Sequence, residues 1–192
     1  MNFAWIAAIS IIIVTINPLL KYVGLLPADV FRSLGIFFPG LPSIVFGPLM
    51  AFLTLVLFIK TGIPHVFLGA STLRALALGF IFPANVVHLG IGLAGIPVSI
   101  IAMKIVKNLG KNRLSRSLPI LSGLYAGFYA SGNYITTILL GPVAQTSTIT
   151  SSPYLVIGII AGSIGLGVLV GLGTNKLMRT LSARSLVRSW LA

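Results

Sequence analysis

The sequence predicts an all-α, polytopic integral membrane protein with six transmembrane helices and both termini cytoplasmic. Three observations lead to this prediction. Of the 192 residues, 57% are hydrophobic and only 7% are charged, whereas a water-facing surface usually needs about 25–35% charged residues. The mean hydropathy is +1.09. Long stretches contain no charged residue at all, and the basic residues flank these stretches rather than interrupt them.

The uncharged stretches allow six crossings of the cell membrane, because a transmembrane helix needs about 20 predominantly apolar residues. The last stretch, residues 117–175, has room for two helices with a polar turn between them around residues 145–153. We expect a single transmembrane helical domain over residues 1–192, with spans at roughly 3–23, 36–59, 64–83, 86–106, 118–140 and 153–175. Pro39, Gly40 and Pro42 should keep the outer end of the second span from forming regular helix.

The distribution of basic residues sets the expected orientation, since cytoplasmic loops carry an excess of Lys and Arg. An even number of spans puts both termini on one side. With both termini inside, the outer side receives only Lys21 and Arg32. The cytoplasmic side receives Lys60, Lys104, Lys107, Lys111, Arg113, Arg116, Lys176, Arg179, Arg184 and Arg188. The basic segments 106–118 and 178–191 should lie at the inner interface, where they attract anionic lipids of the bilayer or dock onto a partner.

Composition excludes several classes of function. Asp29 is the only carboxylate and cysteine is absent, so paired-carboxylate hydrolysis, acidic metal sites and thiolate chemistry lack the residues that they need. His65 and His88 are too few for a closed zinc site. No phosphate-binding Gly-Lys loop or dinucleotide fingerprint is present. We expect no enzyme activity, metal or cofactor, and no nucleic-acid partner, because the basic residues do not form one soluble face.

Small residues at four-residue spacing predict which helices pack together, since they let two backbones approach in lipid. The fifth and sixth spans should therefore pack tightly against each other. The pairs are Gly123/Gly127, Gly127/Ser131 and Ala126/Ala130 in the fifth span, and Gly158/Gly162, Ala161/Gly165 and Gly167/Gly171 in the sixth. A further pair, Ala4 and Ala8, lies near the inner end of the first span.

The Ala4/Ala8 pair, six spans, the length of the chain and an outer loop rich in Ser, Thr and Gln together resemble the substrate-binding S component of energy-coupling factor (ECF) transporters. This resemblance implies a small six-helix protein that captures a vitamin or metal from outside. It also implies that Ala4 and Ala8 dock the first helix onto a transmembrane coupling protein, which two ATPase subunits drive.

Within that family, the middle of the chain is most similar to the cobalt/nickel-type subunit. The similarity rests on Phe46-Gly47-Pro48-Leu49, Leu68-Gly69-Ala70-Ser71-Thr72 and Gly79-Phe80-Ile81-Phe82-Pro83. The metal-binding members begin with Met-His-Ile and use this N-terminus as a ligand. This chain begins with Met1-Asn2-Phe3 and lacks that motif, so cobalt or nickel is not the substrate that we expect.

Arg74 is the outstanding candidate for a functional residue, because an arginine at the bilayer centre costs about 2.5–3.5 kcal/mol on insertion scales. Its side chain could reach an interface, pair with an acidic residue of another subunit, or bind an anionic group of a substrate. Other polar candidates for substrate binding are Asn85, His88, Tyr129, Asn133 and Gln145. Tyr125, Tyr129 and Asn133 share one helix face, although interhelical hydrogen bonds or an ordinary turn would also explain these polar residues.

These observations lead us to expect a membrane-embedded substrate-binding subunit of a multi-subunit uptake transporter for a small solute. Its partners would be a transmembrane coupling protein and ATPase subunits. The alternative is a non-catalytic structural or accessory subunit of a larger membrane complex, in which Arg74 and the basic ends meet acidic neighbours.

Overall fold

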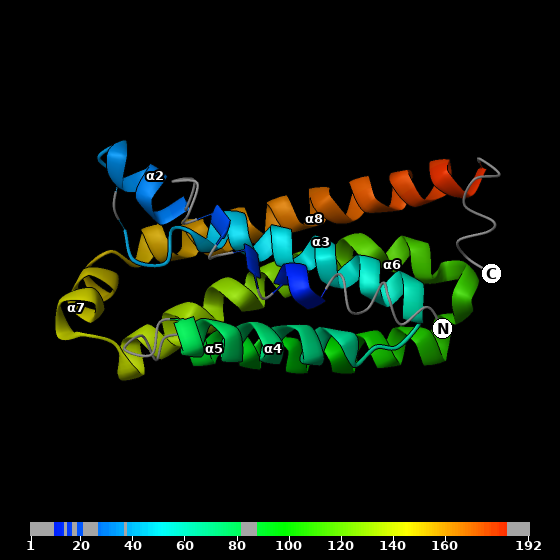
Figure 1. The fold of residues 1–192 in the computed structure, drawn as a ribbon, viewed down its shortest axis with the longest axis horizontal. Helices are drawn as coiled ribbons and strands as arrows, with labels where there is room; N and C mark the ends of the chain where they lie inside the picture. Colours follow the sequence, from blue (N-terminus) through cyan, green and yellow to red (C-terminus); the bar gives the residue numbers. More distant parts are fainter. Residues whose placement is uncertain are drawn as a thin grey trace.

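The structure is a computed structural model that describes residues 10–13, 15–16, 19–20, 27–36, 38–81 and 88–183, with side chains omitted at 27–29, 81, 88, 109–115 and 178–183. All regular secondary structure in these residues is helical (Figure 1), which confirms the all-α prediction. Besides short helical stretches within residues 10–20, the helices are α2 (Pro27–Ser33), α3 (Ser43–Thr61), α4 (Val66–Ile81), α5 (His88–Leu93), α6 (Gly95–Leu140), α7 (Val143–Ser151) and α8 (Pro153–Ala183).

Helix α6 has continuous helical backbone over 46 residues but folds back on itself. A straight helix of that length would extend about 69 Å. Gly90 in α5, however, packs directly against Gly132 in α6, and Figure 1 shows α6 reversing direction at one end of the bundle. The two arms of α6 are therefore antiparallel. They correspond to the fourth and fifth predicted spans, with the basic stretch at the turn between them.

The returning arm of α6 lies in the middle of the bundle. Helix α6 packs most extensively on α8, α3 packs against both, and α4 and α5 pack against α6 as well as each other. The α3–α4 turn lies at the end where α6 reverses, and α7 lies at the opposite end (Figure 1). The main core cluster joins α3, α4 and α6 through side chains such as Phe58, Phe67 and Leu121.

Glycines allow α6 and α8 to approach closely, as the sequence predicts. A Cβ atom at Gly167 would lie 2.8 Å from the carbonyl oxygen of Ser122, and one at Gly171 would lie 2.5 Å from Cα of Pro119. Across the same contact, Gly127 is covered by Ile164. The tight packing of the fifth and sixth spans is thus confirmed. Gly165, by contrast, has nothing within 4 Å.

Three helices within the described residues are long and apolar enough to cross a membrane: Ser43–Thr61, Leu89–Asn108 and Pro153–Leu177. They coincide with the second, fourth and sixth predicted spans. A shorter apolar helix, Val66–Phe80, coincides with the third. The fifth predicted span is the returning arm of α6, and most of the first lies outside the described residues. The turns at residues 39–42 end where α3 begins at Ser43, which confirms the expected irregularity there.

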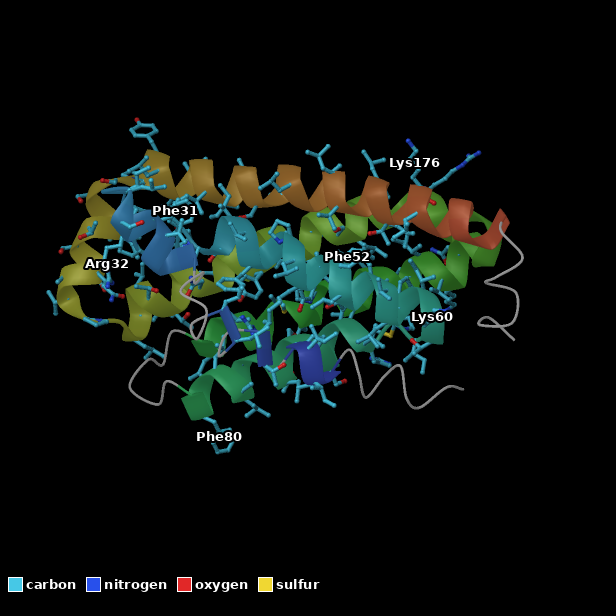
Figure 2. All side chains as sticks on the ribbon, turned by 45° about the horizontal axis from the view of Figure 1, so that its top comes forward. Phe31, Arg32, Phe52, Lys60, Phe80 and Lys176 are labelled. Atoms are coloured by element: carbon cyan, nitrogen blue, oxygen red, sulfur yellow. The ribbon has the colours of Figure 1, made fainter. Side chains whose placement is uncertain are left out.

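Apolar side chains cover much of the outside of the bundle, an arrangement that suits lipid rather than water. Phe80 is 87% exposed and points away from the other helices (Figure 2). Tyr154 and Leu169 on α8 are also exposed. Lys60 and Lys176 lie at one end of the bundle and Arg32 lies towards the other (Figure 2).

Gly167→Ala should destabilise the bundle by about 1–3 kcal/mol, because the new methyl group forces α6 and α8 apart. The matched control Gly165→Ala adds the same methyl group to the open face of α8 and should leave stability unchanged or slightly raised. Thermal unfolding of the detergent-solubilised variants measures both. Greater destabilisation by Gly165→Ala than by Gly167→Ala would mean that α8 buries the opposite face.

Candidate functional site

Arg74 lies in the interior of the bundle, midway along α4, and is only 1% exposed. Its Nη1 donates a hydrogen bond of 2.9 Å to the backbone carbonyl of Ile13. The guanidinium carbon lies 5.4 Å from the centroid of the Phe46 ring, a distance typical of a cation–π contact. The side chain therefore does not reach an interface. Its burial within one chain also leaves it no surface on which to meet an acidic residue of another subunit.

The sequence of α4 directs Arg74 inward. Positions 67, 70, 71, 74, 75 and 78 are buried, whereas 68, 72, 76 and 79 are exposed, which is the spacing of one helix face. Ser71, one turn before Arg74, donates a hydrogen bond of 3.0 Å to the carbonyl of Gly92 and so joins α4 to α5. The buried face of α4 is therefore fixed against α5 one turn before Arg74.

One acceptor of Arg74, the carbonyl of Ile13, belongs to the described segment 10–13. Residues 10–13 are helical, and Thr15 donates to the carbonyl of Ile11 within this segment. Arg74 therefore joins α4 to this helical segment.

Tyr125 is a second aromatic neighbour of Arg74, besides Phe46. Tyr125 on α6 is 1% exposed, interacts electrostatically with Arg74 and lies within hydrogen-bonding reach of the Thr54 side chain. Its ring lies 5.9 Å from that of Phe67, at a tilted angle. Tyr129, one turn further along α6, is also buried. The interior around Arg74 thus combines one positive charge, phenolic hydroxyl groups and aromatic walls.

A polar stripe continues along α6 from this interior to the end where α7 lies. It consists of Tyr125, Tyr129, Asn133 and Thr137, spaced four residues apart, and extends over about 18 Å at 1.5 Å per residue. The Nδ2 of Asn133 donates to Oγ of Ser43 at 3.0 Å. The Oγ1 of Thr137 donates to the carbonyl of Asn133, and Thr146 of α7 donates to the carbonyl of Thr137.

The structure brings together some of the candidate residues and separates others. Arg74 and Tyr129 both line the interior, and Asn133 lies further along the polar stripe. Gln145 is half-buried in α7. His88 begins α5, but its side chain is not described, and Asn85, Ala4 and Ala8 fall outside the described residues.

Several contacts around Arg74 escaped sequence reasoning. Phe46 and Thr54 lie on α3 among many apolar residues, and no spacing rule connects them with Arg74. The carbonyl of Ile13 is a backbone group, so no residue type in the sequence indicates its role.

Comparisons of this chain with models of protein families, with curated proteins and with solved structures find no match. Among the described residues, no group of three or more His, Cys, Asp or Glu side chains could hold a metal ion. The functional interpretation therefore depends on the residues around Arg74 and on the charge distribution of the chain.

Arg74→Met should change stability by less than about 1 kcal/mol, because the loss of the hydrogen bond to Ile13 is offset by the removal of a costly buried charge. Arg74→Ala also leaves a cavity and should cost about 2–5 kcal/mol. Unfolding of both purified variants provides the comparison. If Met destabilises as much as Ala, the guanidinium group is itself a structural requirement of the bundle.

Proposed function

We propose that this chain is the substrate-binding subunit of a multi-subunit uptake transporter, similar to an ECF S component. In this proposal, six helices cross the cell membrane and both termini are cytoplasmic. The observation that supports it best is the polar stripe on α6, which leads from the α7 end of the bundle to the buried Arg74.

Polar groups inside a membrane bundle serve either to join helices or to meet a solute. At its α7 end, the stripe joins helices, since Asn133 contacts Ser43 of α3 and Thr137 contacts Thr146 of α7. At its inner end, Tyr125 interacts electrostatically with both Tyr129 and Arg74. In this proposal, a solute that enters from the α7 end meets the polar groups of this inner end.

The charges at the two ends support an outer position for α7. Lys104, Lys107, Arg116 and Lys176 are exposed at or beside the end where α6 reverses, whereas Arg32 lies towards the opposite end. Since positive charge accumulates on the cytoplasmic side, the α7 end faces outward. The polar stripe then receives solute from outside, as uptake requires.

The hydrogen bond between Arg74 and Ile13 links the inner end of the stripe with the first predicted span. Ala4 and Ala8, the proposed contacts with a transmembrane coupling protein, precede Ile13 in that same span. A solute that changes the partner of Arg74 would therefore act on the segment that docks. The energy for uptake would come from the ATPase subunits of the complex.

Single-cysteine variants test the orientation, because the chain has no cysteine of its own. Thr148 in α7 and Lys107 in α6 are both exposed. In intact cells, a membrane-impermeant maleimide should label Thr148→Cys but not Lys107→Cys, whereas a permeant maleimide should label both. The reverse labelling pattern would mean that the α7 end faces the cytoplasm. That orientation would contradict uptake through the α7 end.

Native mass spectrometry of the gently extracted protein tests solute binding. We expect a small molecule to be retained by the wild type. Tyr129→Phe should weaken retention by about 2–10-fold, as for the loss of one hydrogen bond, because Tyr129 lies in the interior. The matched control Tyr154→Phe removes the same hydroxyl from a side chain that is 87% exposed on α8 and should retain the molecule normally.

The same experiment distinguishes the alternative function. Stoichiometric protein partners without ATPases, together with no retained small molecule, would contradict the uptake proposal. They would identify the chain as a non-catalytic structural or accessory subunit of a larger membrane complex.

A further inference from the structure

We propose that one exposed face of α6 binds an anionic phospholipid, with its phosphate at Lys104 and Lys107 and an acyl chain along Met103, Ile100 and Ile96. This interaction goes beyond the proposed uptake function, since it needs only that the bundle lies in a membrane. The order of side chains on the face, its length and the charge balance of the chain all support it.

The face belongs to the arm of α6 that precedes its turn. Its side chains follow one another at intervals of three and four residues, which places them on one side of the helix. On the opposite side, Val98 and Ala102 are 0% exposed and belong to the main core cluster. The exposed side chains are, in chain order, Ile96, Ile100, Met103, Lys104 and Lys107. The face therefore changes once from apolar to basic, in the direction of the turn.

The length of the face matches one leaflet of a bilayer. From Ile96 to Lys107 it extends over about 16 Å at 1.5 Å per residue. One leaflet contributes about half of the roughly 30 Å hydrocarbon core. A lysine at this depth can lay its apolar stem along the helix while its ammonium group reaches the headgroups. The face thus reaches from the headgroups to about the middle of the bilayer, as a phospholipid of one leaflet does.

The charge balance of the chain favours an anionic headgroup. The sequence has 13 Lys and Arg residues and one acidic residue, Asp29. Asp29 belongs to α2, which lies towards the α7 end and away from the turn of α6 (Figure 1). Lys60 and Lys176 lie at the end where α6 turns (Figure 2) and add to its positive charge. Basic residues at a membrane surface attract anionic lipids, whereas a zwitterionic headgroup brings a positive charge of its own.

The apolar half of the face favours a lipid over an acidic segment of a partner protein. An acidic segment at the membrane surface would contact Lys104 and Lys107 alone and would leave the apolar side chains without a role. A phospholipid carries its negative charge and its apolar chain in the same order as the face presents basic and apolar side chains. Electrostatic attraction and apolar contact then act on the same molecule.

Native mass spectrometry of the full-length protein in a non-ionic detergent tests the proposal. The dissociation constant of the first bound lipid is measured for dioleoyl phosphatidylglycerol and dioleoyl phosphatidylcholine, which differ only in their headgroups. The wild type should bind phosphatidylglycerol at least about tenfold more tightly, as expected for two lysines near an anionic headgroup. The double variant Lys104→Gln/Lys107→Gln should reduce this preference to less than about threefold.

A second double variant provides the matched control. Arg116→Gln/Lys176→Gln removes the same amount of charge from exposed residues near the same end and should keep the preference. Lys104→Arg/Lys107→Arg preserves the charge of the face and should also keep it. If the double Gln variant does not fold, Lys107→Gln alone should lower the preference by about three- to fivefold.

The headgroup alone tests the contribution of the apolar half. Glycerophosphoglycerol carries the phosphate of phosphatidylglycerol without its acyl chains, so a tenfold excess should not displace the lipid. Displacement by this compound, equal binding of the two lipids by the wild type, or equal losses in the Gln double variants would each overturn the proposal. If the two lipids bind equally and a stoichiometric acidic protein co-purifies only while Lys104 and Lys107 are intact, the face belongs to a protein partner instead.

Discussion

Lipid supplies no hydrogen-bond partners, so a polar group inside a membrane bundle must be satisfied by the bundle itself. This constraint accounts for most of the polar contacts between helices. Ser71 reaches the carbonyl of Gly92, and Asn133 reaches Ser43. Many other hydroxyl groups bond to a carbonyl of their own preceding turn, as Thr54 does to Met50. Arg74 is the extreme case, because its charge is held by a backbone carbonyl and an aromatic ring.

Much of the helical arrangement could be predicted from the sequence, because apolar length and small-residue spacing are local signals. They predicted the close contact between α6 and α8, to which Gly167 belongs. The same spacing also occurs at Ala161 and Gly165, which are exposed, so spacing alone could not decide which stripe packs inward. The continuous helical backbone through the turn of α6 was not expected either, since the basic segment 106–118 was expected to lie at the inner interface between two separate spans.

The candidate site was less predictable than the helices. Arg74 stood out because a charged residue in an apolar span is rare, and the spacing of Tyr125, Tyr129 and Asn133 correctly placed them on one face of α6. The partners of Arg74 come from segments far away in the sequence. Ile13 precedes it by 61 residues and contributes only a backbone atom. A backbone acceptor of this kind is brought to Arg74 by tertiary packing, and no residue type or spacing in the sequence predicts it.

The position of Arg74 within α4 bears on why the chain keeps a buried charge. Helix α4 has 16 residues and is therefore about 24 Å long, shorter than the roughly 30 Å of a hydrocarbon core. Arg74 lies seven residues before the end of α4, about 10 Å from it. A long side chain this close to a helix end commonly turns towards the headgroups, but Arg74 turns inward to Ile13. Because anchoring at the interface would need the opposite orientation, the guanidinium group serves the interior of the bundle.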